Sequence, residues 1–184
     1  MLDDPVPLST KLTGEVILRR LTTADAELFA AHVVGDADRL FEYLPWPRAT
    51  ATPAGAAEML GLYERREDGR VVIAGAFDAD RLLGGALIFH HDPVQVKAEL
   101  GVWTVAAGEG TGVAYAACRA LVALAREQLR VERLEWVCSV DNPRSRALAE
   151  RLGFTHEGRL RSYFVLNERR HDTDILSLVG HELR

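Results

Sequence analysis

The stretch Glu99–Cys118, ELGVWTVAAGEGTGVAYAAC, decides the fold, because it predicts a strand that leads through a glycine-rich turn into a helix. Leu100, Val102 and Trp103 are apolar residues, two of them β-branched or aromatic as strands prefer. From Val113 onward the apolar residues recur at helical spacing. Glycines permit positive φ angles and a close approach of the backbone to a ligand, and the first N–H groups of a helix lack partners. The stretch therefore predicts an anion-binding site.

The spacing of the glycines excludes two familiar phosphate-binding motifs. The chain contains no Gly-x-x-x-x-Gly-Lys-Ser/Thr sequence, so the turn is not a P-loop. Gly108, Gly110 and Gly112 stand at every second position and do not form Gly-x-Gly-x-x-Gly. The acidic residue that a dinucleotide fold places about 20 positions later would be Glu127, inside a predicted helix. A dinucleotide-binding fold is therefore disfavoured, while the turn by itself is equally consistent with an ordinary loop before a helix.

Composition narrows the class of protein. The 184 residues are 48% hydrophobic and 27% charged, which is typical of a soluble domain with a substantial core. No apolar run reaches the ~18 residues of a membrane span, and the acidic start of the chain lacks the features of a signal peptide, so we expect a cytoplasmic protein without a membrane partner. Cys118 and Cys138 are too few for a disulfide framework and fit no zinc pattern, so no metal is expected. The net charge of −5 argues against nucleic acid as a partner and is compatible with a cationic substrate.

The first half of the chain predicts helices inserted into an antiparallel meander. Residues 1–14 are polar and contain prolines, so we expect an N-terminal arm before one domain over residues 15–184. Thr22 or Thr23, and later Pro53, are typical helix-start residues. The predicted strands cover 16–21, 71–77, 82–90 and the segment around Glu99, and the predicted helices begin near 24, 36 and 53.

The second half predicts helices between strands. The helix from Val113 is followed by a strand over 134–140, and Asn142 and Pro143 are suited to the N-cap and first position of the next helix. Gly153 ends that helix. Two long strands are expected over 154–167 and 171–181. The sequence thus predicts a single mixed α/β (α+β) domain with about seven strands flanked by helices.

A second stretch supplies the most specific resemblance. Residues 141–154, DNPRSRALAERLGF, combine Asn-x-x-Ser with a helix that ends in Leu-Gly-Phe. This combination resembles the C-terminal signature of the GCN5-related N-acetyltransferases, the GNAT superfamily. The downstream Glu-Gly-x-x-Arg at 157–161 resembles the RimJ/RimL branch, as do residues 18–26 and 98–103. Residues 109–114, EGTGVA, resemble the family's pyrophosphate loop, (Arg/Gln)-x-x-Gly-x-(Gly/Ala), except that Glu109 replaces Arg or Gln. The pieces keep the family's order from about residue 15 to 181.

The resemblance implies a GNAT fold with a twisted, mostly antiparallel sheet. Its central strands, here 99–105 and 134–140, would splay into a V that admits the pantetheine arm of acetyl-CoA, the expected cosubstrate. Asn142 would either contact the cosubstrate or only cap its helix. Backbone groups of Trp103, Thr104 and Val105 would pair with the pantetheine, and N–H groups of Gly110, Thr111, Gly112, Val113 and Ala114 would hold the pyrophosphate.

The implied chemistry is direct transfer of an acetyl group from a thioester to a primary amine. An alkyl amine with a pKa near ~10 is protonated at neutral pH, so a base must take its proton. Glu99 is the candidate base, with an ion-paired strand carboxylate as the alternative. A backbone N–H near Thr104 or Val105 would stabilise the oxyanion. Ser145, by its place in the resemblance, is the candidate acid for the leaving thiolate, with an ordinary first-turn role as the alternative.

The acceptor and two rival functions stay open at this point. The acceptor amine could belong to a protein N-terminus or to a small molecule such as an amino acid, a polyamine or an antibiotic. Glu109 favours a different class, a catalytically degenerate GNAT-fold module that binds acyl-CoA as a sensor or interaction partner. A scaffold without a coenzyme site is the other rival. Homodimers are common in the branch that the chain resembles, so a homodimer is the default expectation.

Overall fold

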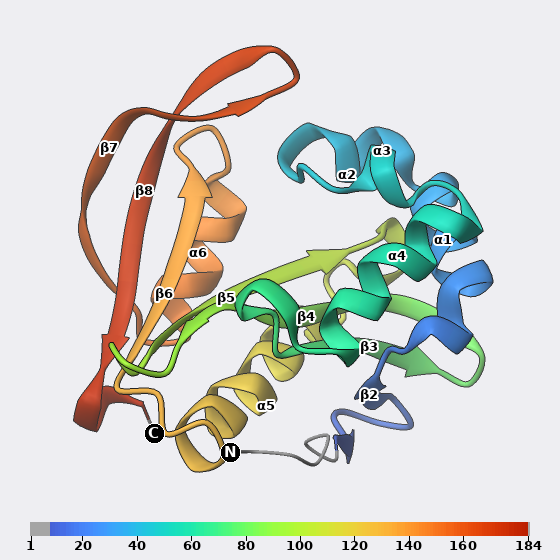
Figure 1. Cartoon of the computed structure of the whole chain (residues 1–184), viewed down its shortest axis with the longest axis horizontal. Coiled ribbons are helices and arrows are strands. Elements are labelled where there is room, and N and C mark those ends of the chain that lie inside the picture. The colour runs from blue at the N-terminus through green and yellow to red at the C-terminus, as the bar shows by residue number, and fades with distance from the viewer. Residues whose placement is uncertain (1–7, 184) are drawn as a thin grey trace.

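Residues 8–183 are described by the computed structural model, and their strands form one sheet in the order β1-β2-β3-β4-β5-β6-β8-β7 (Figure 1). Neighbouring strands are antiparallel except β5 and β6, which are parallel. The strands are β1 Ser9–Lys11, β2 Ile17–Arg20, β3 Val72–Asp78, β4 Arg81–Asp92, β5 Lys97–Thr104, β6 Arg133–Ser139, β7 Thr155–Leu166 and β8 Arg169–Val179.

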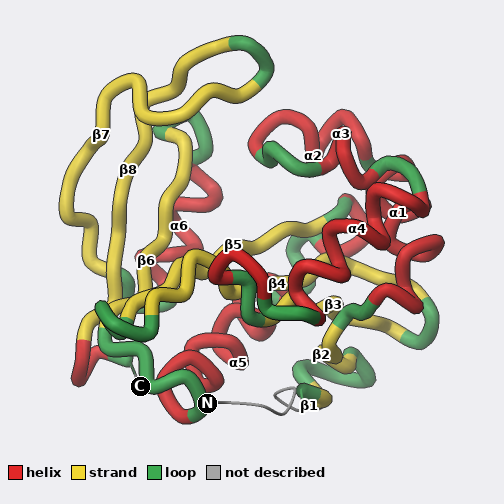
Figure 2. The backbone as a smooth tube through the Cα atoms, in the orientation of Figure 1, coloured by secondary structure: helices red, strands yellow, loops and turns green. Residues whose placement is uncertain are grey.

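Helices cover both faces of the sheet (Figure 2). One face carries the 3-10 turn η1 Thr23–Asp25 and the helices α1 Ala26–Gly35, α2 Ala37–Tyr43, α3 Pro47–Thr50 and α4 Pro53–Glu64. The other face carries α5 Val113–Glu127 and α6 Pro143–Arg151. Short 3-10 turns lie at η2 Glu67–Gly69, η3 Ala106–Gly108 and η4 Gly180–Glu182. No helix within residues 8–183 is long and apolar enough to cross a membrane.

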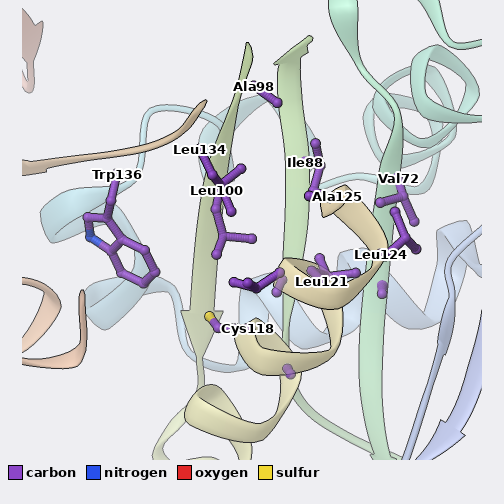
Figure 3. Packing of buried hydrophobic residues seen from close by; sticks show 14 of the residues in the cluster. Val72, Ile88, Ala98, Leu100, Cys118, Leu121, Leu124, Ala125, Leu134 and Trp136 are labelled. Carbon is purple, nitrogen blue, oxygen red and sulfur yellow. The ribbon is translucent and has the colours of Figure 1, made fainter. Parts of the chain in front are cut away.

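The helix α5 fills the larger core because its apolar residues recur every three or four positions, as the sequence predicts. Leu121 is fully buried and lies at the centre of this face (Figure 3). Its neighbours in the core come from the helix itself and from four strands, namely Ala117, Cys118, Leu124, Ala125, Val72, Ile88, Leu100 and Leu134. Since residues of β3, β4, β5 and β6 share this core, α5 holds together the strands on both sides of the parallel pair.

An aromatic cluster forms the core on the opposite face. Trp103 of β5 packs edge-on against Phe29 of α1 and Trp46, with ring centroids 5.9 Å apart in both pairs. Its indole Nε1 donates a hydrogen bond to Nε2 of His32, 3.2 Å away. Burial lowers the pKa of His32 to about 4, although Asp36 opposes the shift, so the ring is neutral and can accept this hydrogen bond. The end of β5 is thereby fixed to α1.

The predicted elements are present, with two differences. The sheet has eight strands because β1, which lies within the predicted N-terminal arm, pairs with β2. Residues 1–7 of that arm, and Arg184, lie outside the described residues. The short helix α3 is not among the helices that the sequence predicts. Pro47 occupies the first position of α3, where the missing N–H costs nothing.

The parallel pair β5 and β6 is joined over only three residue pairs, from Lys97 with Arg133 to Glu99 with Glu135. Beyond Glu99 the two strands diverge, and each continues with its own neighbour, β4 or β8. The sheet therefore opens into a V between β5 and β6 (Figure 1). This is the splay that the resemblance implies.

We predict that Leu121→Ala lowers the free energy of unfolding by about 2–5 kcal/mol, because the change leaves a cavity in a core that cannot close around it. Urea titration followed by circular dichroism measures the loss. Val94→Ala is the matched control, since Val94 is 84% exposed in the turn between β4 and β5, and it should change stability by less than about 0.5 kcal/mol. Equal effects of the two substitutions would contradict the central place of Leu121.

Candidate active site

A cleft of about 590 Å³ lies in the V between the arm that ends with β5 and the arm that carries α6. Its walls come from α2, the end of β5, the glycine turn, the first turn of α5 and the length of α6. Seven of the residues predicted from the sequence line it, namely Trp103, Thr104, Gly110, Gly112, Ala114, Asn142 and Ser145. Glu99, Val105, Thr111 and Val113 do not. Segments that are far apart in the sequence thus meet at one cleft.

The glycine turn places helix amides at the end of the cleft. Gly110 and Gly112 have φ angles of 69° and 81°, which L-residues rarely adopt. The Thr111 hydroxyl donates to the Gly108 carbonyl at 2.7 Å and accepts from the Val113 amide at 3.3 Å. Thr111 and Val113 therefore shape the turn from within and do not face the cleft. The next amides of α5, beginning with Ala114, have no acceptor within the helix and stand at the positive end of its dipole.

The exposed edge of β5 follows from its register with β4. The Val105 amide donates to the Leu83 carbonyl at 3.2 Å, and residues of an antiparallel pair face the partner strand alternately. The amides of Val105 and Trp103 therefore point toward β4, whereas those of Thr104 and Val102 point into the V. This corrects the prediction that Trp103 and Val105 offer backbone groups to a ligand, and that Val105 supplies an oxyanion donor. Of the three predicted residues, Thr104 has a backbone amide that points into the V. The amide of Val102, which was not predicted, points the same way.

Glu109 is paired with two arginines that the sequence analysis did not single out. One of its carboxylate oxygens accepts hydrogen bonds from Arg39 of α2 and from Arg144 of α6. Arg39 also pairs with Asp36 at 3.3 Å. Arg151 lines the same cleft with its guanidinium 4.4 Å from the centre of the Tyr115 ring. The cleft lining therefore holds three guanidinium groups, those of Arg39, Arg144 and Arg151, beside the carboxylates of Glu42 and Glu109.

The other wall of the cleft holds Ser145 in a network of hydrogen bonds. Asn142 caps α6, because its side-chain oxygen accepts the Ser145 amide at 3.0 Å. The Ser145 hydroxyl accepts the indole N–H of Trp136 at 3.0 Å, and Trp136 is only 2% exposed. Burial raises the pKa of the Cys138 thiol, and the neighbouring Ser145 hydroxyl opposes that shift. Since its oxygen already accepts a hydrogen bond, the Ser145 hydroxyl has its own proton to donate.

Glu99 lies at the closed end of the V, on the face that carries α1–α4. Its side chain is 17% exposed and its Oε2 lies 3.0 Å from Nδ1 of His90, which is 70% exposed. His90 stands in a bulge of β4 with a φ of 50°, a strained backbone that turns its ring toward Glu99. Burial raises the pKa of Glu99, and the neighbouring Glu135 adds to the shift while His90 opposes it. A carboxylate of this kind titrates closer to neutral pH than an ordinary glutamate.

The sequence indicates a role in the site for some of these residues and not for others. Arg144 lies inside the Asn-x-x-Ser motif, so its position near the cleft could have been inferred. Arg39 is 70 residues from Glu109, and Trp136 reads as an ordinary core residue of a strand. Neither carries a local pattern. Within residues 8–183 no group of three or more His, Cys, Asp or Glu side chains is placed to hold a metal ion.

Comparison with known proteins points to one family. The family model described as “Acetyltransferase (GNAT) domain” matches residues 15–155. “Putative ribosomal N-acetyltransferase YdaF” of Bacillus subtilis (strain 168) is 32% identical over 174 residues, which cover 94% of this chain and 95% of that protein.

Solved structures agree in fold. One called “Crystal structure of Probable acetyltransferase” is 30% identical, with a TM-score of 0.85 over 95% of this chain and 98% of that chain. RimL, a ribosomal L7/L12 alpha-N-protein acetyltransferase solved in complex with coenzyme A, is 22% identical, with a TM-score of 0.84 over 95% of this chain and 99% of that chain. At 22% identity, the likeness to RimL shows a shared fold.

We predict that Glu99→Gln stabilises the protein at neutral and alkaline pH. Because burial raises the pKa of Glu99 in the folded state, the native protein binds more protons than the unfolded chain between the ordinary and the raised pKa, and stability falls as pH rises through that window. Glutamine does not titrate, so the stability of the variant does not fall in this pH window. Urea unfolding across a pH series should show the largest gain above the folded-state pKa and none below the ordinary glutamate pKa. A gain that does not depend on pH would contradict the electrostatic cause.

Proposed function

The chain belongs to the GNAT family of acetyltransferases, and from that membership we propose that it moves the acetyl group of acetyl-CoA onto a primary amine by direct attack. The observation that carries the proposal is the cleft at the splay of β5 and β6, with the glycine turn at one end and Glu99 beyond the other. No covalent enzyme intermediate is needed, because donor and acceptor can meet within one V-shaped opening from the two faces of the sheet.

The residues of the cleft fit acetyl-CoA along its length. The amides at the start of α5, Arg144 and Arg151 suit phosphate groups. The outward-facing backbone groups of Thr104 and Val102 suit the amides of an extended pantetheine arm, since such an arm can pair as a strand does. From Val105 to Glu99 the strand spans about 20 Å at ~3.3 Å per residue. A donor held at the turn and laid along β5 therefore brings its thioester toward the closed end of the V.

Glu99 is the proposed general base. The attacking nitrogen must lose a proton before or as it forms the new C–N bond, and a carboxylate with a raised pKa is a better acceptor of that proton at neutral pH than an ordinary one. Because Glu99 lies on the face of the sheet that carries α1–α4, we propose that the acceptor amine approaches from that face. Glu99 does not line the cleft itself, so the proposal includes a water between Glu99 and the amine.

The leaving group and the oxyanion need separate partners. The tetrahedral intermediate places negative charge on the former carbonyl oxygen, and the outward-facing amide of Thr104 is the proposed donor to it. When the C–S bond breaks, the electron pair goes to sulfur. The Ser145 hydroxyl, which accepts from Trp136, is the proposed donor of a proton to that thiolate.

The names of the relatives support one proposal for the acceptor class. The Bacillus relative and an Escherichia coli protein that is 30% identical over 56% of this chain are both named for ribosomal substrates. We therefore propose that the acceptor is a protein N-terminal amine. We also propose that the protein works in the cytoplasm, with a homodimer as its default assembly. The sensor alternative was favoured by the unmatched charge of Glu109. That charge is balanced by Arg39 and Arg144, so no observation now favours it.

We predict that Gly112→Asp abolishes binding of acetyl-CoA and of CoA in calorimetric titration while the protein stays folded. A β-carbon at Gly112 would meet no atom within 4 Å, but the φ of 81° strains any L-residue there, so the loss comes from negative charge at the proposed pyrophosphate site together with strain in the turn. Gly14→Asp is the matched control, because Gly14 also has a positive φ and open space around it but does not line the cleft. Unchanged affinity in Gly112→Asp would rule out the turn as the pyrophosphate site.

We predict that Glu99→Gln lowers kcat by about 100-fold or more, as loss of a general base does, with little change in CoA affinity. The acid limb of the pH–rate profile, which reports protonation of Glu99, should disappear. Glu135→Gln is the comparison variant, since removal of this like charge lowers the pKa of Glu99 and should move the acid limb to lower pH. A Glu99→Gln enzyme with the wild-type pH profile would remove Glu99 from the role of base.

A further inference from the structure

Glu109 joins the two walls of the cleft at its phosphate end. Arg39 belongs to α2, on the face of the sheet that carries α1–α4, and Arg144 belongs to α6, on the opposite face. Both guanidinium groups donate to the same carboxylate oxygen of Glu109. All three residues line the cleft. The carboxylate therefore sits between two cations that would otherwise face each other across the opening.

A phosphate oxygen could take the place of that carboxylate oxygen. Guanidinium groups bind carboxylates and phosphates through the same charge-assisted hydrogen bonds. Glu109 follows Gly108 and precedes Gly110, whose φ of 69° marks a turn, and its side chain is 34% exposed. The carboxylate can therefore swing into water without disturbing a core.

We propose that Glu109 is a built-in competitor, which occupies Arg39 and Arg144 in the ligand-free protein and yields them to a phosphate group of coenzyme A. Arg39 and Arg144 are then phosphate ligands contributed by opposite walls, beyond the backbone amides of the turn. The inference rests on the proposed function, because it takes coenzyme A as the donor.

The arrangement has two physical consequences. Before binding, the carboxylate prevents repulsion between the guanidinium groups and keeps both near the position where a phosphate is needed, which lowers the ordering cost of binding. During binding, its displacement subtracts from the affinity. Because the ion pairs are partly exposed, each contributes little, so the subtraction is modest.

The test is calorimetric titration with CoA of the wild type, Glu109→Gln, the double variant Arg39→Gln/Arg144→Gln, and the triple variant that combines all three substitutions. Glu109→Gln should bind CoA about fivefold more tightly, the equivalent of about 1 kcal/mol. The arginine double variant should bind it about tenfold more weakly. In the double-variant background, Glu109→Gln should bring no further gain, since nothing remains to compete for. Glu127→Gln, the same charge change at the far end of α5, is the control and should leave CoA affinity unchanged.

Three other results have distinct meanings. A fivefold gain that persists without the arginines would show simple repulsion between Glu109 and phosphate, and would overturn the inference. A Glu109→Gln variant that binds CoA no better than the wild type, or more weakly, would also overturn it. A wild-type protein that binds no CoA at all would instead remove the proposed function. Urea unfolding of each variant shows whether the protein titrated is folded.

Discussion

The structure depends on the point at which β5 and β6 stop pairing. Three residue pairs join these parallel strands, and the backbone groups beyond them stay unpaired on the inner edges of the V. Each strand is then fixed to its own side by a tryptophan. Trp103 donates its indole N–H to His32 of α1, and Trp136 donates its indole N–H to Ser145 of α6. Both tryptophans are buried and hydrogen-bonded on separate arms, so each arm of the V is packed against its own helix.

In the proposed mechanism, the same division separates the two substrates. The helices α5 and α6 lie on one face and supply the phosphate end of the cleft and Ser145. The helices α1–α4 lie on the other, where Glu99 and the proposed acceptor side are found. A single sheet can therefore hold the donor at its unpaired edge while the acceptor approaches from the opposite face. The chemistry needs no mobile domain, only the opening that the sheet already has.

Charge is arranged at both ends of the V at some expense of stability or affinity. At the closed end, Glu99 and Glu135 are register partners on adjacent strands, and burial of Glu99 disfavours its ionised form. At the open end, Glu109 occupies two arginines that suit a phosphate. Functional residues commonly reduce stability in this way, because a group that must bind or accept a proton later cannot be fully satisfied beforehand. In their proposed roles, Glu99 with its raised pKa and Glu109 with its shared arginines are both instances.

Features that depend on residues a few positions apart could be predicted from the sequence. The glycine turn, the cap by Asn142, the start of α4 at Pro53 and the core face of α5 all follow from local rules of backbone geometry and periodicity, and the order of the motifs predicted the fold. Tertiary structure decided the rest. Which amides of β5 face the V depends on register with β4, and so Thr104 and Val102 replaced Trp103 and Val105. The partners of Glu109 lie 70 and 35 residues away, where no local pattern constrains them. Contacts of that kind exist only after the chain has packed, because the sheet and its helices, and not the sequence spacing, bring those side chains together.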